Sequence, residues 1–223
     1  MISKLLLGSH THVVCEDTVD YIETTDDISG GIFDGCSTGN SSKWASETFN
    51  FLFKRENYNL NDLNILSVIQ DLNSILSYVE ADFTHAYSTA ILFNYDKLTK
   101  TLLLRAFGDC SYWVNGVRFD VNANNHPDYI AYHLEESVVN LDRYLKKNPI
   151  RTFENVSDFI ITSDGIDRLK FPTHKEFNFN FLNSLLSPPN GKPYLERMWN
   201  LAKRDGWFLE DDLSIISYNG NGV

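Results

Sequence analysis

Cysteine is scarce in this sequence, and its spacing excludes the usual cysteine-based architectures. The 223 residues contain only three cysteines, Cys15, Cys36 and Cys110, and no two of them form a CxxC pair. An odd count without such a pair predicts neither a disulfide framework nor a zinc knuckle, and it fits a reducing compartment. We therefore expect a cytoplasmic protein.

Positive charge is also in short supply. Nineteen Lys and Arg residues stand against 30 Asp and Glu residues, which gives a formal net charge of −11. Because phosphate backbones are bound by Lys and Arg, nucleic acid is not expected as a partner. Most of the surplus acid serves to solvate the surface, but carboxylates that cluster would bind cations.

Long apolar runs and linkers are missing as well. The apolar run at the N-terminus covers only residues 5–7, which is too short for a signal-peptide core or a membrane span, so no membrane partner is expected. No Pro-, Gly- or Ser-rich stretch divides the chain. With 43% hydrophobic residues, the sequence predicts a single domain over residues 1–223.

Hydrophobic periodicity predicts strands in consecutive groups and helices in pairs. We expect strands at 3–7, 12–16, 28–33, 88–95, 101–107, 112–119, 157–162 and 213–218, with a tight hairpin turn at Asn115-Gly116. We expect helices at 43–54, 61–81, 128–147, 174–187 and 193–205. This order is typical of an α+β fold in which helices pack outside antiparallel sheet.

Carboxylates stand at the ends of several predicted strands. They are Glu16 and Asp17, Asp34 before Gly35, Asp109, Asp164 before Gly165, and Asp211 and Asp212. Taken singly, each has an ordinary explanation as a turn, a cap or a solvated loop charge. Taken together, strand ends of one sheet system can converge, and convergent carboxylates repel one another unless a cation neutralises them. Carboxylates, a backbone carbonyl and water are the ligands that Mg²⁺ or Mn²⁺ prefers.

Six short segments follow one another in a recognisable order. They are Glu16-Asp17, GIFDG at 31–35, STAILF at 88–93, FGDCSYWV at 107–114, FIITSDGID at 159–167 and DDLSIIS at 211–217. In this order and strand context the chain resembles the metal-dependent protein Ser/Thr phosphatases of type 2C. The resemblance spans roughly residues 8–218 and is thin over 120–156 and 168–205. It implies a four-layer α-β-β-α sandwich of two antiparallel sheets flanked by helices.

The resemblance also implies a metal centre of two Mn²⁺ or Mg²⁺ ions that share Asp34. Its further ligands would be Asp17, the Gly35 carbonyl, Asp164 and Asp211, with Glu16 acting through water and Asp109 holding a third ion. Asp34 and Asp164 would be catalytic through a water that bridges the two metals and attacks phosphorus in line.

Three positions depart from the family pattern. His12 stands where the family commonly has a phosphate-binding Arg, so we expect His12 to contact phosphate weakly and His12→Arg to lower KM. Cys36 replaces a family His, and its thiol beside metal ions is expected to be open to oxidation. Asp211-Asp212 replaces Asp-Asn, and we assign Asp211 as the ligand because it precedes LSIIS at the family spacing.

By resemblance, the function is hydrolysis of phosphoserine and phosphothreonine in proteins. Two alternatives stay open. The missing Arg favours a phosphatase of a small phosphorylated molecule, and a pseudophosphatase that serves as a binding module would keep the same fold. All five ligand positions retain usable groups, which argues against the module.

Overall fold

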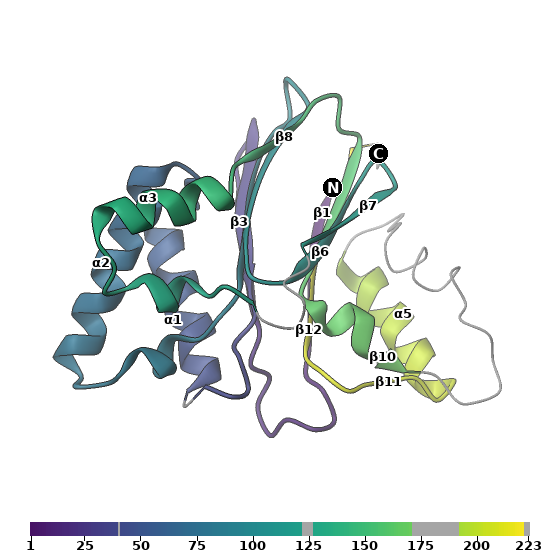
Figure 1. Ribbon diagram of the computed structural model, residues 1–223. Coiled ribbons are helices and arrows are strands. Elements are labelled where there is room, and N and C mark those ends of the chain that lie inside the picture. The colour runs from purple at the N-terminus through teal and green to yellow at the C-terminus, as the bar shows by residue number, and fades with distance from the viewer. Residues whose placement is uncertain (40, 122–126, 171–191, 221–223) are drawn as a thin grey trace.

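Two five-stranded antiparallel sheets, stacked face to face, form the centre of the molecule (Figure 1). The computed structural model describes residues 1–39, 41–121, 127–170 and 192–220. The first sheet has the strand order β1-β12-β9-β6-β7 and the second β2-β3-β4-β5-β8, while β10 and β11 form a short ribbon. The strands are β1 (Ile2–Leu7), β2 (Thr18–Glu23), β3 (Asp27–Phe33), β4 (Ala90–Asp96), β5 (Thr101–Phe107), β6 (Cys110–Val114), β7 (Val117–Val121), β8 (Arg151–Phe153), β9 (Asp158–Thr162), β10 (Leu169–Lys170), β11 (Phe208–Leu209) and β12 (Leu213–Asn219).

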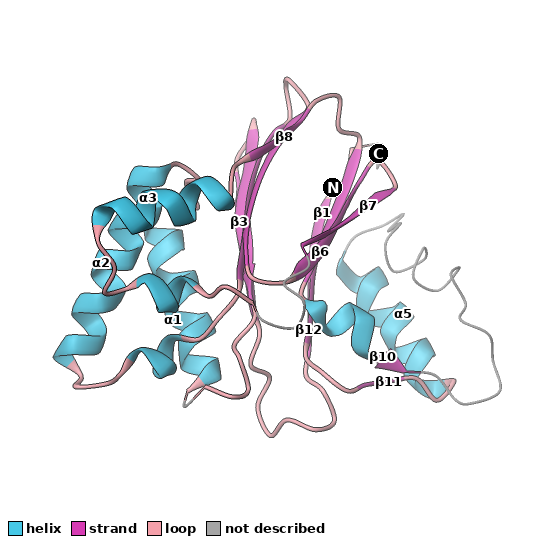
Figure 2. Ribbon diagram, viewed as in Figure 1, coloured by secondary structure: helices cyan, strands magenta, loops and turns pink. Residues whose placement is uncertain are grey.

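Helices cover the outer faces of both sheets (Figure 2). On the second sheet lie α1 (Ser42–Arg55), α2 (Asp62–Tyr78) and α3 (Val138–Lys147), and on the first lies α5 (Lys192–Arg204). Three 3₁₀ turns, η1 (Phe83–Ala86), η2 (Ile130–His133) and η3 (Asp164–Arg168), lie between these elements. The expected α+β fold of two antiparallel sheets with flanking helices is therefore confirmed.

Side chains along the central strands point alternately to the two faces of each sheet, and both faces are buried there. Ile32 packs between the sheets, whereas its neighbour Phe33 packs against α1 and α2. In the first sheet, Ile216 faces the other sheet and Ile215 faces α5. A strand that is covered on both sides needs a continuous apolar run, which explains segments such as IIT and SIIS.

Some expected elements differ from the observed ones. Residues 12–16 form no strand but an exposed loop whose Val13 is fully open to solvent, because this segment pairs with no neighbouring strand. The strand lies instead at Thr18–Glu23, where TVDYIE pairs with β3. The expected helix at 128–147 is broken into η2 and α3. The short strand Arg151–Phe153 was not predicted, since three residues carry too little pattern.

Other expectations hold within a few residues. The hairpin turn is confirmed, with Asn115 and Gly116 at φ 49° and 78° between β6 and β7. The expected helix at 61–81 ends at Tyr78, and that at 193–205 matches α5. The expected helix at 174–187 lies outside the described residues.

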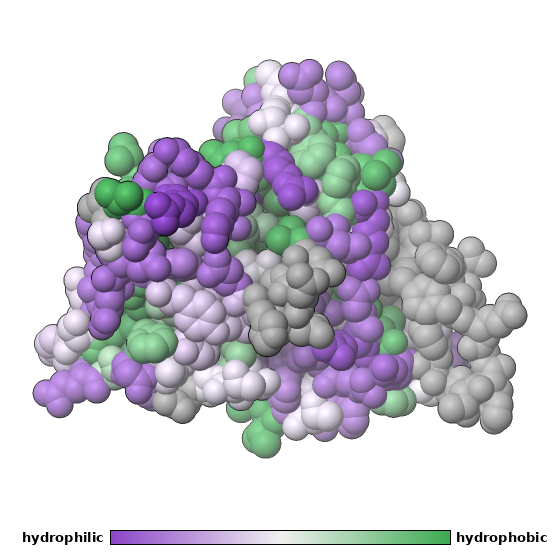
Figure 3. Space-filling view, in the orientation of Figure 1, coloured by the Kyte–Doolittle hydropathy of each residue, from purple (hydrophilic) through white to green (hydrophobic). Residues whose placement is uncertain are grey.

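Hydrophobic side chains on the face in Figure 3 are scattered among hydrophilic ones. Among the described residues, no helix combines the length and the apolar character that crossing a bilayer requires.

Candidate metal centre

The register of β2 and β3 places Asp17 beside Asp34. The strands are antiparallel and Thr18 pairs with Phe33, so the residue before β2 lies next to the residue after β3. Asp17 is fully buried, whereas Asp34 is partly exposed. Antiparallel pairing therefore brings together two carboxylates that are 17 positions apart in the sequence.

The first sheet repeats this arrangement with β9 and β12. Ile215 pairs with Thr162, and the Ser163 amide donates to the Ser214 carbonyl at 3.1 Å. Asp164, which follows β9, consequently lies on the same sheet edge as Asp211, which precedes β12. Each sheet thus contributes a pair of carboxylates at the ends of two neighbouring strands.

Ser163 joins the two sheets at this edge. Its buried hydroxyl donates to Oδ2 of Asp17 at 2.8 Å and accepts the Ser214 amide at 3.0 Å. Asp17 precedes a strand of the second sheet, while Ser163 and Ser214 belong to the first. This bridge fixes the carboxylate of Asp17 in the gap between the sheets. The sequence pattern predicts no role for Ser163, although this residue directly precedes the motif residue Asp164.

The carboxylates surround a hollow of about 300 Å³. Of the expected site residues, those that line it are Glu16, Asp34, Gly35, Asp109, Asp164 and Asp211. Asp17 lies buried beside Asp34, and His12 lines a different hollow with Trp44. The structure therefore brings six of the expected residues around one space and leaves His12 at its side.

Mutual repulsion and burial raise the pKa values of the central carboxyls. Burial raises the pKa of Asp17 to about 6, against the opposing hydrogen bond from Ser163. Burial, followed by the charge of Asp211, raises the pKa of Asp164 to about 6. Burial and the charges of Asp17 and Asp164 raise the pKa of Asp34 well above its usual range. Asp34 is thus the carboxylate that both neighbours crowd.

Burial also raises the pKa of Asp109, while Arg168 opposes the rise and Asp211 adds to it. Asp109 follows Gly108, where the chain passes from β5 in one sheet to β6 in the other. Gly108 has φ +98°, a conformation that glycine adopts without strain. This crossing places Asp109 at the edge where the four strand ends meet.

The donor set fits hard divalent cations. Oδ1 of Asp17 is buried and has no hydrogen-bond partner among the described residues, which leaves this oxygen available to a ligand. The surrounding oxygen donors belong to carboxylates whose pKa values are raised by burial and then by mutual repulsion, and a divalent ion would relieve that repulsion. Oxygen donors of this kind suit Mg²⁺ or Mn²⁺. A soft metal prefers several thiolate ligands, which these carboxylates do not provide.

Gly35 is required by a close backbone approach and not by its dihedral angles. A Cβ atom on Gly35 would lie 2.2 Å from the Ser42 carbonyl oxygen at the start of α1. The segment is also held by a bridge between Gly35 and Ser88 and by a hydrogen bond from the Thr89 amide to the Asp34 carbonyl at 2.9 Å. The Asp-Gly pair is therefore no simple turn, because α1 begins directly against it.

We expect Gly35→Ala to destabilise the protein by about 3 kcal/mol, because the methyl group meets backbone that cannot move independently. The backbone movement that makes room for this methyl group should also displace Asp34 and weaken Mn²⁺ binding. Denaturant unfolding and Mn²⁺ titration measure the two effects. Gly116→Ala is the control, since nothing lies within 4 Å of a Cβ there. Its positive φ gives that control a strain cost but no effect on the metal. Wild-type Mn²⁺ affinity in Gly35→Ala would contradict this account.

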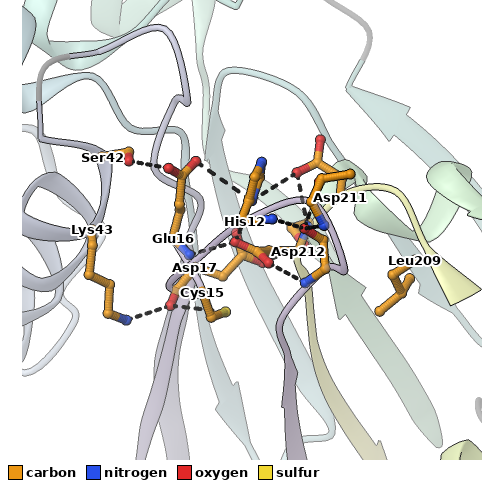
Figure 4. A network of polar contacts seen from close by, with 12 residues as sticks. His12, Cys15, Glu16, Asp17, Ser42, Lys43, Leu209, Asp211 and Asp212 are labelled. Carbon is orange, nitrogen blue, oxygen red and sulfur yellow. Dashed lines mark hydrogen bonds and ion pairs between the residues drawn. The ribbon is translucent and has the colours of Figure 1, made fainter.

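Asp212 anchors the loop that precedes β2 (Figure 4). It is buried, and its carboxylate accepts the Ser9 amide at 2.6 Å, the Glu16 amide at 2.5 Å and Nδ1 of His12 at 3.0 Å. The sequence suggested a solvated loop charge here as one explanation. The structure corrects this, because Asp212 closes the loop against the start of β12, whereas Asp211 remains half-exposed.

His12 is held among carboxylates. Its Nδ1 also lies 3.9 Å from Glu16 and 4.0 Å from Asp211. Partial burial lowers the pKa of His12, but the hydrogen bond and charge of Asp212, with the charges of Glu16 and Asp211, outweigh it and raise that pKa. One nitrogen of His12 and one oxygen each of Glu16 and Asp212 lie within 4.8 Å of one another. Their hydrogen bonds explain this compact group.

Cys36 lines the hollow next to Gly35. Its Sγ lies 3.0 Å from Oγ1 of Thr38, and its amide donates to the Tyr87 carbonyl at 3.0 Å. The thiol is half-buried, so solvent reaches it. The expected oxidation of Cys36 remains a prediction.

Several solved structures share this fold. RsbX, solved in complex with magnesium, superimposes with a TM-score of 0.60 and 14% identity over 96% of this chain and 92% of its own. A bacterial serine phosphatase matches with a TM-score of 0.63 and 12% identity over 100% and 98% of the two chains. PppA, a regulatory component of the type VI secretion system in Pseudomonas aeruginosa, matches with a TM-score of 0.63 and 11% identity over 97% and 96%.

The chain has the fold of the PP2C-type phosphatases. The structure of SpoIIE from Bacillus subtilis that contains its PP2C phosphatase domain matches with a TM-score of 0.61 and 19% identity, over 97% of this chain and 61% of that one. No family model matches the sequence, and no curated protein matches it either. The resemblance seen in six short motifs is thus confirmed at the level of the fold.

Proposed function

We propose that this chain is one catalytic domain, a cytoplasmic metal-dependent phosphatase that hydrolyses phosphoserine and phosphothreonine in proteins. The observation that carries the proposal is that carboxylates from the strand ends of two sheets converge on one side of the sandwich. They are Asp17, Asp34, Asp164 and Asp211. On that side, Oδ1 of Asp17 is buried without a partner among the described residues. The PP2C-type fold supports the same reading.

Each residue has a proposed role in holding two Mn²⁺ or Mg²⁺ ions. Asp34 lies between the other carboxylates and would be shared by both ions. Asp17 and the Gly35 carbonyl would serve one side, and Asp164 and Asp211 the other. When bound, the ions would supply an activated water for attack on phosphorus and neutralise the charge that develops on the phosphate oxygens.

The remaining residues position these ligands. Glu16 accepts the Ser42 hydroxyl at 2.6 Å, which holds its carboxylate at the hollow, where it would act through water. Asp109 lines the hollow close to Asp164 and is the proposed ligand of a third ion. Lys43 donates to the Asp17 carbonyl at 2.8 Å and ties the loop to α1.

Hydrolysis of p-nitrophenyl phosphate with Mn²⁺, with and without a chelator, tests the proposal. A phosphatase releases nitrophenol only when metal is present, whereas a pseudophosphatase releases none. A panel of phosphoserine peptides and small phosphate esters then separates the two enzyme alternatives. Preference for a small ester by more than about 100-fold in kcat/KM would replace the protein substrate by a small molecule.

His12 stays a proposed phosphate contact, and His12→Arg tests it. A guanidinium that reaches the substrate grips two phosphate oxygens, so KM for p-nitrophenyl phosphate should fall with kcat little changed. His12→Gln is the matched variant, because it keeps a hydrogen-bonding side chain without the charge. An unchanged or higher KM in His12→Arg would mean that Asp212 and Glu16 retain the new side chain, and that position 12 does not face the phosphate.

A further inference from the structure

Arg168 is the basic residue, among those described, that lines the carboxylate hollow. It closes η3, four residues after Asp164, and its side chain is exposed. The other charged residues around this space are Glu16, Asp34, Asp109, Asp164 and Asp211, all of them acidic. A dianionic phosphate that enters the hollow would therefore meet one fixed cation.

The Arg168 guanidinium makes no close pair with a carboxylate of the described residues, and its charge acts on Asp109 and Asp164 only at longer range. Over the described ranges, no carboxylate lies within ion-pair distance of it, and no hydrogen bond from its side chain is found. A guanidinium without protein partners keeps its full donor set for a ligand, and its planar fork matches two oxygens of a phosphate.

Neighbouring cations are already committed. Arg118 donates to both carboxylate oxygens of Asp167, at 2.9 and 2.8 Å, and lies over the ring of Trp113 at 5.0 Å. Lys170 pairs with Glu210 at 3.3 Å. Releasing either would break an existing pair, whereas Arg168 binds an anion without such a cost.

Arg168 also stands where two hollows meet. A second hollow of about 400 Å³ adjoins the first, and the two share Asp109, Asp164 and Arg168 in their linings. A phosphate at the carboxylates and the rest of a substrate in the second hollow would have Arg168 at their junction. Asp167 and Arg118, which pair with each other, also line that second hollow.

We propose that Arg168 binds the substrate phosphate and supplies the cation that position 12 lacks. The proposal rests on the phosphatase function proposed above. The recognised group is a phosphate monoester dianion, which a phosphoprotein and a small phosphate ester have in common. Arg168 is a binding residue here, and the chemistry would be supplied by the ions that the carboxylates would hold.

The test compares Arg168→Ala and Arg168→Lys with Arg143→Ala, which removes the same charge from an exposed position on α3. Calorimetry measures the affinity of each Mn²⁺-loaded protein for inorganic phosphate, and kinetics measure KM for p-nitrophenyl phosphate and for a phosphoserine peptide. We expect Arg168→Ala to weaken the binding of phosphate and to raise KM for both substrates by the same factor, at least about tenfold. Arg168→Lys should lie between Arg168→Ala and the parent. Arg143→Ala should match the parent.

Mn²⁺ titration in the absence of phosphate separates phosphate binding from an indirect effect. Removing a cation beside carboxylates should leave Mn²⁺ affinity unchanged or raise it, so a loss of phosphate affinity at undiminished Mn²⁺ affinity supports the proposal. Weaker Mn²⁺ binding in Arg168→Ala, or a loss limited to the peptide, would overturn it.

The two proposals can fail separately. Should the parent bind phosphate but hydrolyse neither substrate, the phosphatase function fails while the calorimetric comparison still decides the role of Arg168. Phosphate affinity in Arg168→Ala within twofold of Arg143→Ala, or no phosphate binding by the parent, would overturn the role of Arg168.

Discussion

Asp34→Asn should reduce Mn²⁺-dependent hydrolysis by at least about 10³-fold, equivalent to roughly 4 kcal/mol of transition-state stabilisation. Asp34 is the carboxylate that both Asp17 and Asp164 crowd, so one substitution removes the ligand that two ions would share. An amide has the same shape but cannot neutralise cations. The assay is kcat/KM for p-nitrophenyl phosphate at saturating Mn²⁺.

The fold should survive the substitution. Because burial and the charges of Asp17 and Asp164 raise the pKa of Asp34, removing its charge should make the metal-free protein more stable at neutral pH, which a higher Tm would show. Asp26→Asn is the control, since it removes the same charge from an exposed turn between β2 and β3. Near-parental turnover by folded Asp34→Asn would refute the shared-ligand role.

The metal-free protein should lose stability as the pH rises from about 4 to above 6. In the folded protein, burial raises the pKa of Asp17 and that of Asp164 to about 6, above the ordinary Asp value of 3.8. At low pH both carboxyls are protonated in the folded and in the unfolded state, so they do not change the free energy of unfolding there. As the pH rises, these carboxyls lose their protons in the unfolded chain first, which favours unfolding. The loss of folding stability is complete above pH 6.

The expected loss is on the order of 3 kcal/mol, or roughly 6–12 °C in Tm for a chain of this size. Saturating Mn²⁺ should reverse it, because an ion that binds only the folded state stabilises by about 2.7 kcal/mol at 100 times its Kd. The Mn²⁺-induced rise in Tm should be larger at pH 7.5 than at pH 5, since the ligands must be deprotonated. Thermal unfolding with and without Mn²⁺ at several pH values measures both trends. A metal-free Tm that stays constant or increases from pH 5 to 7.5 would argue against a crowded carboxylate site.

Local sequence signals were sufficient for the two strands that end at Asp34 and Asp164. Asp34 follows an apolar run that is buried on both faces, and Asp164 follows another, so the run predicts the strand and its end predicts the position of the carboxylate. The strand before Asp17 was misplaced by several residues. Glu16 and Asp17 nevertheless stayed at a strand boundary, because TVDYIE begins directly after them.

Tertiary contacts decided what the sequence could not. In the sequence only the family spacing separates Asp211 from Asp212, whereas in the fold Asp211 lines the hollow and Asp212 is buried beneath the loop at 8–16. The role of Ser163 depends on a strand in the other sheet. Arg168 belongs to a segment where the motif resemblance is thin, and only the folded chain places it beside Asp109.

The most direct test of the account is the number and coupling of bound Mn²⁺ ions. Calorimetric titration together with electron paramagnetic resonance should find two tightly bound ions per chain in the parent, besides a weaker third ion at Asp109. The two tight ions should give the exchange-coupled signal of a pair that shares Asp34. Asp34→Asn should lose the coupled signal, and Asp26→Asn should keep it. A single uncoupled ion in the parent, or no binding at all, would contradict the two-metal centre on which the proposed phosphatase depends.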